Sequence, residues 1–182
     1  MELRDMKLKL LELLKKEAVK KGEFVLSSGR KSNYYLDGRV ITLTPEGAYL
    51  VANIILEMLK DEEIDGVGGP TLGADPIVGA IAAISHINNI PLKTFIVRKA
   101  AKEHGMQRKI EGPQLKKGSS VILVDDVATT GKSLIEAKDA LEESGIKVSR
   151  AIVIVDRNEG AAENLRQSGI ELVPIFNIRD IS

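Results

Sequence analysis

Short runs of purely aliphatic residues, each followed by a segment with helical periodicity, constrain the fold of this chain more than any other feature. Residues 121–124 and 151–155 contain no polar side chain. A strand without a polar face must be buried on both faces, which is typical of a parallel sheet covered by helices. The pattern therefore predicts an α/β fold with a twisted, mainly parallel sheet flanked by helices.

The same alternation continues through most of the chain. Thr44 and Pro45 are residues preferred at the N-cap and first position of a helix, so a helix is predicted to begin there. Ligands of such folds bind at the carboxyl ends of the strands, which directs attention to the turns after Val67 and Val124. The other predicted elements are strands at 64–67, 93–97 and 172–176, helices at 75–86 and 131–143, and a short helix that ends near Gly169.

The N-terminal segment departs from this alternation. Residues 3–21 carry leucines at helical spacing and predict an amphipathic helix that stops at Gly22. The short apolar runs 24–26 and 34–36 surround a turn rich in Ser, Gly and Asn. They predict a small β-hairpin before the main sheet begins.

Residues 98–117 form a second exception. They contain seven Lys or Arg against two Asp or Glu and show no apolar periodicity. A loop of this length inside a compact domain is uncommon unless it is functional. We therefore expect a basic functional loop there.

Composition excludes several classes of protein. The 26 Lys and Arg balance the 26 Asp and Glu, which argues against a dedicated nucleic-acid binder or a protein held on anionic lipid. The absence of cysteine excludes disulfides and thiolate sites, and two histidines, His86 and His104, nearly exclude multi-histidine metal sites. The 182 residues fit one domain, and without a signal peptide or membrane span we expect a cytoplasmic protein.

The strongest chemical motif lies where the 121–124 strand ends. Asp125 and Asp126 come directly after it, and a Thr-Thr-Gly-Lys-Ser turn then opens a helix. The N–H groups at a helix N-terminus suit a phosphate, whereas two carboxylates suit sugar hydroxyls or a hydrated Mg²⁺. The motif therefore predicts a site for a sugar phosphate with free hydroxyls and a metal.

Two simpler interpretations of this motif are weaker. An acidic N-cap explains one carboxylate near a helix start but not two on the end of a buried strand, where desolvation penalises them. A Walker A loop is suggested by Gly131-Lys132-Ser133, but its upstream glycine would stand at position 126, which is Asp126. We reject the Walker A interpretation for that reason.

The stretch Asp-Asp-Val-Ala-Thr-Thr-Gly at 125–131 resembles the phosphoribosyl-pyrophosphate signature of the type I phosphoribosyltransferases. Three further segments resemble that family in the same order: 24–35, 98–105, and Asp156-Arg157 after the next strand. The whole chain is most similar to the branch that acts on orotate. The resemblance implies the fold of that family, with a small N-terminal hood at about 1–40 and a mobile loop at about 98–117.

The resemblance also implies a role for individual residues. Asp125 and Asp126 would bind the ribose hydroxyls and act in catalysis together with the loop residues Lys102 and His104. The other contacts it implies are the 5′-phosphate on Thr129, Thr130, Gly131, Lys132 and Ser133, the pyrophosphate on Arg98, Lys99, Lys102 and His104, and orotate on Thr129 and Arg157 beneath the hood residues Tyr34 and Tyr35.

A cofactor and an assembly are implied as well. Mg²⁺ would be bound mainly through the substrate, with Asp125 or Asp126 reaching it through water. The implied enzyme is a homodimer with shared active sites, in which the loop of one subunit serves the site of the other. It transfers the 5-phosphoribosyl group of phosphoribosyl pyrophosphate to N1 of orotate, giving orotidine 5′-monophosphate and pyrophosphate in pyrimidine biosynthesis.

The chain departs from the family at two positions. Many relatives carry Lys where this chain has Ser27, and many carry Lys where it has Gly73. Lys31 and Lys93 are candidate substitutes for those cations. At Arg157 the alternative to a ligand contact is an ion pair with Asp156 or Glu159, and the sequence favours the ligand because a forked guanidinium suits the orotate carboxylate.

Two other functions on the same fold are less favoured. A purine phosphoribosyltransferase of the hypoxanthine type would carry an acid where this chain has Thr129. A regulator that only senses phosphoribosyl pyrophosphate would add a nucleic-acid-binding element, and it would not need the Lys102 and His104 loop. The sequence therefore favours orotate transfer, with no nucleic acid or membrane partner.

Overall fold

The computed structural model describes residues 1–25, 31–90, 92–99 and 109–181, and within them six strands form the main sheet in the order β5-β4-β3-β6-β7-β8. All neighbouring strands are parallel except β5, which runs antiparallel to β4 at the edge. This confirms the predicted mainly parallel α/β sheet. The strands are β3 (Gly66–Pro70), β4 (Lys93–Val97), β5 (Ile110–Glu111), β6 (Ser120–Ala128), β7 (Lys147–Asp156) and β8 (Glu171–Asn177).

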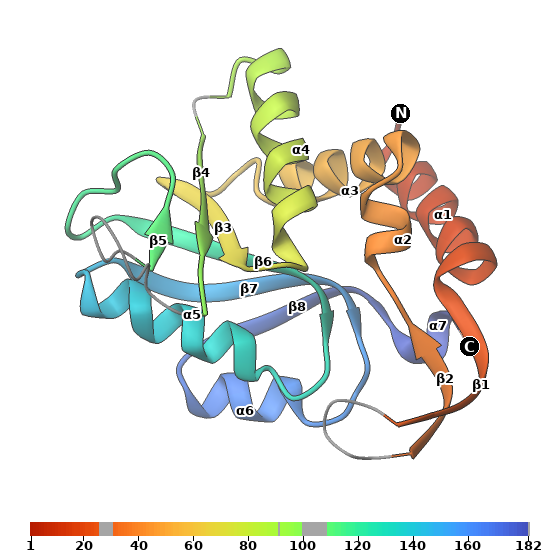
Figure 1. Cartoon of the computed structure of the whole chain (residues 1–182). Helices are drawn as coiled ribbons and strands as arrows, with labels where there is room; N and C mark the ends of the chain where they lie inside the picture. The colour runs from red at the N-terminus through yellow and green to blue at the C-terminus, as the bar shows by residue number, and fades with distance from the viewer. Residues whose placement is uncertain (26–30, 91, 100–108, 182) are drawn as a thin grey trace.

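Helices cover both faces of this sheet (Figure 1). One face carries the longer helices of the first half of the chain, and the other carries the two helices that follow β6 and β7. On the first face lie α1 (Leu3–Leu13), α3 (Pro45–Met58) and α4 (Ala74–Ile87), and on the second α5 (Lys132–Glu143) and α6 (Ala161–Gln167).

The central strands are buried on both faces, as their composition predicts. In β6, Ile122 and Val124 pack with α1, α3 and α4, while Val121 and Leu123 pack with α5 and α6. All four side chains are at most 1% exposed. Alternate residues of a strand point to opposite faces, so an unbroken apolar run supplies both cores at once.

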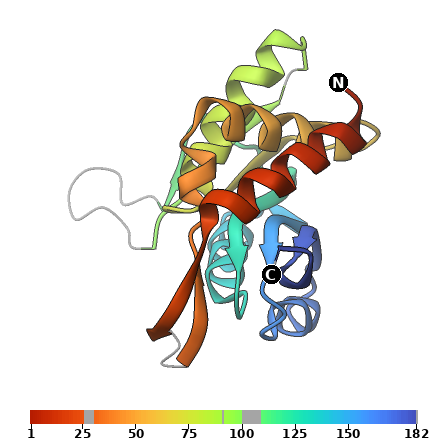
Figure 2. The ribbon, with the colours of Figure 1, turned by 90° about the vertical axis from the view of Figure 1, so that its right-hand side faces the viewer.

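The N-terminal helix is shorter than predicted. It ends at Leu13, continues as a π-helical turn over Leu14–Ala18, and gives way to strand β1 (Val19–Val25). β1 pairs antiparallel with β2 (Lys31–Leu36), with Val19 opposite Leu36. Pairing with β2 overrides the local helical spacing, and the resulting hairpin projects as an arm away from the end of α1 (Figure 2).

Three other elements were not predicted. Strand β5 lies inside the segment that the sequence assigns to a loop, and Val97 pairs there with Ile110. Two single-turn helices, α2 (Arg39–Thr42) and α7 (Ile178–Ile181), are too short for any periodicity to reveal them.

The predicted start of α3 at Thr44 and Pro45 is confirmed, because the backbone N–H of Gly47 donates to Thr44 Oγ1 at 3.1 Å.

Candidate active site

A cavity of about 450 Å³ opens at the carboxyl ends of β3, β6 and β7. Its position is the one expected for a ligand site in a parallel sheet. The turn after β3 contributes one wall, the end of β6 another, and the segment after β2 a third. The lining residues are Tyr35, Leu36, Asp37, Arg39, Thr71, Leu72, Gly73, Lys99, Asp125, Asp126, Val127, Thr129, Ser133 and Arg157.

Asp125 and Asp126 belong to β6 itself, near its carboxyl end, whereas the sequence placed them after the strand. Asp125 is 7% exposed and accepts hydrogen bonds from the Ser133 hydroxyl at 3.3 Å and from the backbone N–H of Asp126 at 2.9 Å. Asp126 Oδ1 accepts from the backbone N–H of Val127 at 2.8 Å. These bonds hold both carboxylates at the floor of the cavity.

The two carboxyls share an unfavourable environment for charge. Burial raises the pKa of Asp125 well above its usual range, and the neighbouring charge of Asp126 raises it further. Burial also raises the pKa of Asp126, while the positive charge of Arg39 acts in the opposite direction. A cation or a hydroxyl donor entering the cavity would therefore be stabilised by groups that lack solvent.

Two glycines, Gly73 and Gly38, pack their backbones closely against Asp126. A β carbon at Gly73 would lie 2.4 Å from Asp126 Oδ1 and 2.2 Å from Asp125 Oδ1. On the other side, a β carbon at Gly38 would lie 3.0 Å from Asp126 Oδ2. Only glycine at these positions lets the turn after β3 and the start of α2 approach the carboxylates so closely.

The turn between β6 and α5 is shaped for an anion. Gly131 has φ +76°, a conformation that side chains rarely adopt, and it places Ser133 in the first turn of α5. The N–H groups of that first turn have no carbonyl partner within the helix. Of the residues predicted to hold a phosphate, Thr129 and Ser133 line the cavity, whereas the Lys132 side chain is 82% exposed and lies 3.7 Å from Glu136.

Arg157 follows β7 and is nearly buried, with a side chain 4% exposed. Its Nε donates to Glu159 Oε1 at 2.8 Å, and its guanidinium carbon lies 4.8 Å from the centre of the Tyr34 ring. The sequence disfavoured an ion pair here, and that interpretation was wrong, because the pair with Glu159 forms. Nη2 is nevertheless buried without a hydrogen-bond partner among the described residues, so a ligand contact stays a prediction.

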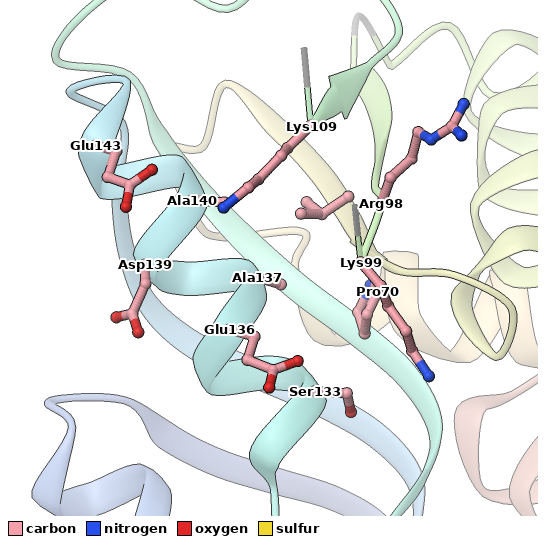
Figure 3. Close-up of a pocket in the computed structure, with 11 residues that line it drawn as sticks. Pro70, Arg98, Lys99, Lys109, Ser133, Glu136, Ala137, Asp139, Ala140 and Glu143 are labelled. Carbon is pink, nitrogen blue, oxygen red and sulfur yellow. The ribbon is translucent and has the colours of Figure 1, made fainter. Parts of the chain in front are cut away.

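The basic residues at the end of β4 divide between two cavities. Lys99 lines both the cavity already described and a neighbouring one of about 350 Å³ between the end of β4 and α5 (Figure 3). Arg98 lines only the second, and its Nη1 lies 3.5 Å from Glu111. The structure therefore brings Lys99 to the carboxylates but not Arg98.

Several predicted residues are not tested by this geometry. Lys102 and His104 lie outside the described residues, as do Ser27 and the side chain of Lys31. The prediction of Lys93 as a substitute cation was wrong, because Lys93 lies at the amino end of β4 and the cavity opens at the carboxyl ends of the strands. Its Nζ donates there to the carbonyl of Gln114 at 2.9 Å.

Asp37 and Arg39 line the cavity although no sequence pattern assigned them. The available signal was an Asp-Gly-Arg run directly after the strand that ends at Leu36. Opposite charges around a glycine also occur in ordinary surface turns. The sequence could not distinguish the two cases.

The described residues contain no group of three or more His, Cys, Asp or Glu side chains arranged to hold a metal ion. Three carboxylates line the described part of the cavity, those of Asp125, Asp126 and Asp37, and Asp37 is paired with Arg39. Within the same part of the chain, no helix is both long and apolar enough to cross a bilayer.

Known proteins resemble this chain in sequence and fold. The profile of the family described as "Phosphoribosyl transferase domain" matches residues 41–171, more than half of the chain. The orotate phosphoribosyltransferase of Nostoc sp. is 44% identical over 173 residues, which cover 95% of this chain and 84% of that protein. The solved orotate phosphoribosyltransferase of Mycobacterium tuberculosis is 38% identical with a TM-score of 0.84, covering 97% of this chain and 99% of that one. A second structure of it, in complex with phosphoribosyl pyrophosphate, has a TM-score of 0.80 at 34% identity, covering 97% and 98%.

Proposed function

The chain belongs to the phosphoribosyl transferase family and, within it, to the orotate phosphoribosyltransferases, and from this premise we propose how its residues perform the reaction. The enzyme transfers the 5-phosphoribosyl group of phosphoribosyl pyrophosphate to N1 of orotate. The products are orotidine 5′-monophosphate and pyrophosphate, in pyrimidine biosynthesis.

One observation carries the assignment of roles. The acidic pair, the first turn of α5 and Arg157 all open into one cavity at the carboxyl edge of the sheet. The three features match three parts of the substrates: ribose hydroxyls, a 5′-phosphate and the carboxylate of orotate. The M. tuberculosis relative has been solved in complex with phosphoribosyl pyrophosphate, a molecule that carries the first two of these parts.

We propose that the 5′-phosphate binds at the first turn of α5. Backbone N–H groups from Thr130 to Ser133 and the Thr129 hydroxyl are the available donors, and the helix dipole favours the negative charge. Lys132 contributes its backbone there, because its side chain is exposed and faces Glu136.

We propose that Arg157 recognises the orotate carboxylate. The face of Tyr34 and the Glu159 carboxylate fix the guanidinium plane and leave Nη2 for a ligand. A buried N–H without a partner is costly, so a substrate that supplies an acceptor gains more than one that does not. This difference would separate orotate from uracil, which has no carboxylate.

The acidic pair would act electrostatically during transfer. As the bond from ribose C1 to pyrophosphate breaks, positive charge develops on the ribose. N1 of orotate forms the new bond to C1, and its proton passes to solvent water. Asp125 and Asp126 line the cavity, and their negative charge would stabilise the positive charge that develops on the ribose. Both act best ionised, so bound ribose hydroxyls and cations must offset their desolvation.

Mg²⁺ fits this donor set as a substrate-borne ion. Mg²⁺ prefers carboxylate, phosphate and water oxygens, and it keeps several waters rather than requiring an all-protein cage. Two desolvated carboxylates, with no cluster of three or more His, Cys, Asp or Glu among the described residues, suit that mode. When bound, the ion would neutralise the charge of the pyrophosphate, and Asp125 or Asp126 would reach it through water.

We further propose a homodimer in which Lys102 and His104 of one subunit complete the site of the other. Arg98 supports this, because it lines the second cavity rather than the one that holds the acidic pair of its own subunit, and it lies beside Glu111. Cations delivered by a closing loop would stabilise the departing pyrophosphate only when the site is shut. A cytoplasmic location remains our expectation from the sequence.

The test is an absorbance assay for loss of orotate in the presence of phosphoribosyl pyrophosphate and Mg²⁺. Hypoxanthine and uracil run in parallel should not be consumed. Consumption of hypoxanthine instead of orotate would favour a purine enzyme. Binding of phosphoribosyl pyrophosphate without turnover of any base would favour a sensor.

A further inference from the structure

Arg39 reaches the active-site cavity in a fixed orientation. Its Nε and Nη2 donate to the two oxygens of Asp37, at 3.0 Å and 3.3 Å, and its backbone N–H donates to Asp37 Oδ1 at 3.1 Å. A two-point pair of this kind fixes the guanidinium plane as well as its position. Asp37 therefore holds Arg39 before any substrate arrives.

The rest of the guanidinium is available to a ligand. Of the five N–H groups of an arginine side chain, Asp37 accepts two, and the remaining three have no partner among the described residues. The side chain is 41% exposed and lines the cavity together with Gly73, Lys99 and Asp126. The adjacent Gly38 packs against Asp126, which places the start of α2 directly beside the acidic pair.

The turn after β3, which contains Gly73, cannot supply a cation to the cavity. Any side chain at Gly73 would collide with Asp125 and Asp126, so lysine could not stand there unless the carboxylates moved. Arg157 is engaged at the other end of the cavity by Glu159 and Tyr34. Among the described lining residues this leaves Arg39 and Lys99 as cations near the Gly73 turn.

We propose that Arg39, oriented by Asp37, binds the pyrophosphate group of phosphoribosyl pyrophosphate and so supplies the positive charge that this chain lacks at Gly73. The inference rests on the proposed function of the cavity. Arg39 contacts the substrate, whereas Asp37 is a positioning residue that acts through Arg39. A forked guanidinium suits the oxygens of a phosphate better than an ammonium does.

Binding measurements test the contact directly. Phosphoribosyl pyrophosphate, inorganic pyrophosphate and ribose 5-phosphate are each titrated into wild type and Arg39→Gln by calorimetry with Mg²⁺ present. We expect the variant to lose roughly ten- to hundred-fold in affinity for the first two, the effect of a charged hydrogen bond, and little for ribose 5-phosphate. Equal affinity of wild type and variant for pyrophosphate would overturn the proposal, as would an equal loss for all three ligands.

Kinetics test the roles of the two residues. Arg39→Gln should raise the KM for phosphoribosyl pyrophosphate while leaving the KM for orotate within about two-fold. Asp37→Asn should raise the same KM by less, and it should add nothing when combined with Arg39→Gln, because residues that act through one another are not additive. Additive effects would remove Asp37 from the positioning role, and a raised KM for orotate alone would place Arg39 at the base.

Two controls keep the outcome interpretable. Arg166→Gln removes a similar guanidinium–carboxylate pair, with Glu163, on an exposed surface of α6, and it should change neither KM. If Arg39→Gln does not fold, Arg39→Lys carries the same comparison, since it keeps the charge but loses the fork. Wild-type protein that fails to consume orotate would refute the proposed function, whereas active wild type with an unaffected Arg39 variant refutes only this inference.

Discussion

The guanidinium carbon of Arg157 lies 4.8 Å from the centre of the Tyr34 ring. Tyr34 belongs to the β1–β2 hairpin and Arg157 directly follows β7, so this contact joins the N-terminal arm to the carboxyl edge of the main sheet. Stacking and the ion pair with Glu159 together hold the arginine in one orientation. This end of the cavity is therefore built by two segments distant in sequence, the β1–β2 hairpin and the residues that follow β7.

Arg157→Lys should separate recognition of the base from stability. Lysine keeps the charge but loses the fork that matches a carboxylate, so the KM for orotate should rise while that for phosphoribosyl pyrophosphate changes little. Steady-state kinetics with each substrate varied in turn measure both values. A lower melting temperature with unchanged kinetics would mean that the ion pair with Glu159 is the whole role of Arg157.

Asp125→Asn and Asp126→Asn should each reduce turnover while the fold survives. Each change removes charge and keeps shape, and the loss of kcat should be on the order of 10²-fold if the acids stabilise charge in the transition state. Circular dichroism serves as the folding check. Near-normal kcat in both variants would contradict the electrostatic role.

The free energy of unfolding should depend on pH through the ionisation of Asp125. Its pKa is raised in the folded state, so the folded protein binds a proton more tightly than the unfolded chain does. The contribution of Asp125 to the free energy of unfolding is then most favourable at low pH and is lost as pH rises from the usual carboxyl range through the raised pKa.

In the Asp125→Asn variant the side chain at position 125 does not titrate, so this pH-dependent contribution to stability is absent. In urea unfolding with substrates absent, the variant should therefore gain stability relative to wild type as pH rises through that window, and be at least as stable at neutral pH. A difference between the two proteins that does not change with pH would show that Asp125 is not destabilised by burial.

The shared active site can be tested by subunit complementation. Lys102→Ala disables the loop and Asp125→Asn disables the ribose site, so each homodimer should be nearly inactive. If each loop serves its partner, one site of the mixed dimer carries both changes and the other carries neither. Mixing should then restore up to about half of the wild-type activity per mixed dimer, as follows from a two-fold symmetric interface. Activity that stays at the level of the homodimers would assign each loop to its own subunit.

Local sequence was sufficient where neighbouring residues decide the structure. The apolar runs of β6 and β7 specify buried parallel strands by composition alone, and Thr44 specifies a helix start through one hydrogen bond. Asp125, Asp126 and the 129–133 turn are contiguous in the chain. The acidic and phosphate-binding parts of the candidate site could therefore be predicted together.

Only the tertiary structure decided which distant residues meet those groups. Residues 19–21 have helical spacing but form a strand because β2 pairs with them. From the sequence alone, both Lys93 and the position of Gly73 are candidates for a cation near the site. Strand direction puts Lys93 at the amino end of β4, away from the cavity, whereas the turn after β3 brings Gly73 against the carboxylates. Asp37 and Arg39 reach the cavity because Gly38 packs on Asp126. Periodicity and composition describe the neighbours of a residue along the chain, whereas these contacts depend on how strands are ordered in the sheet and how closely backbones approach across it.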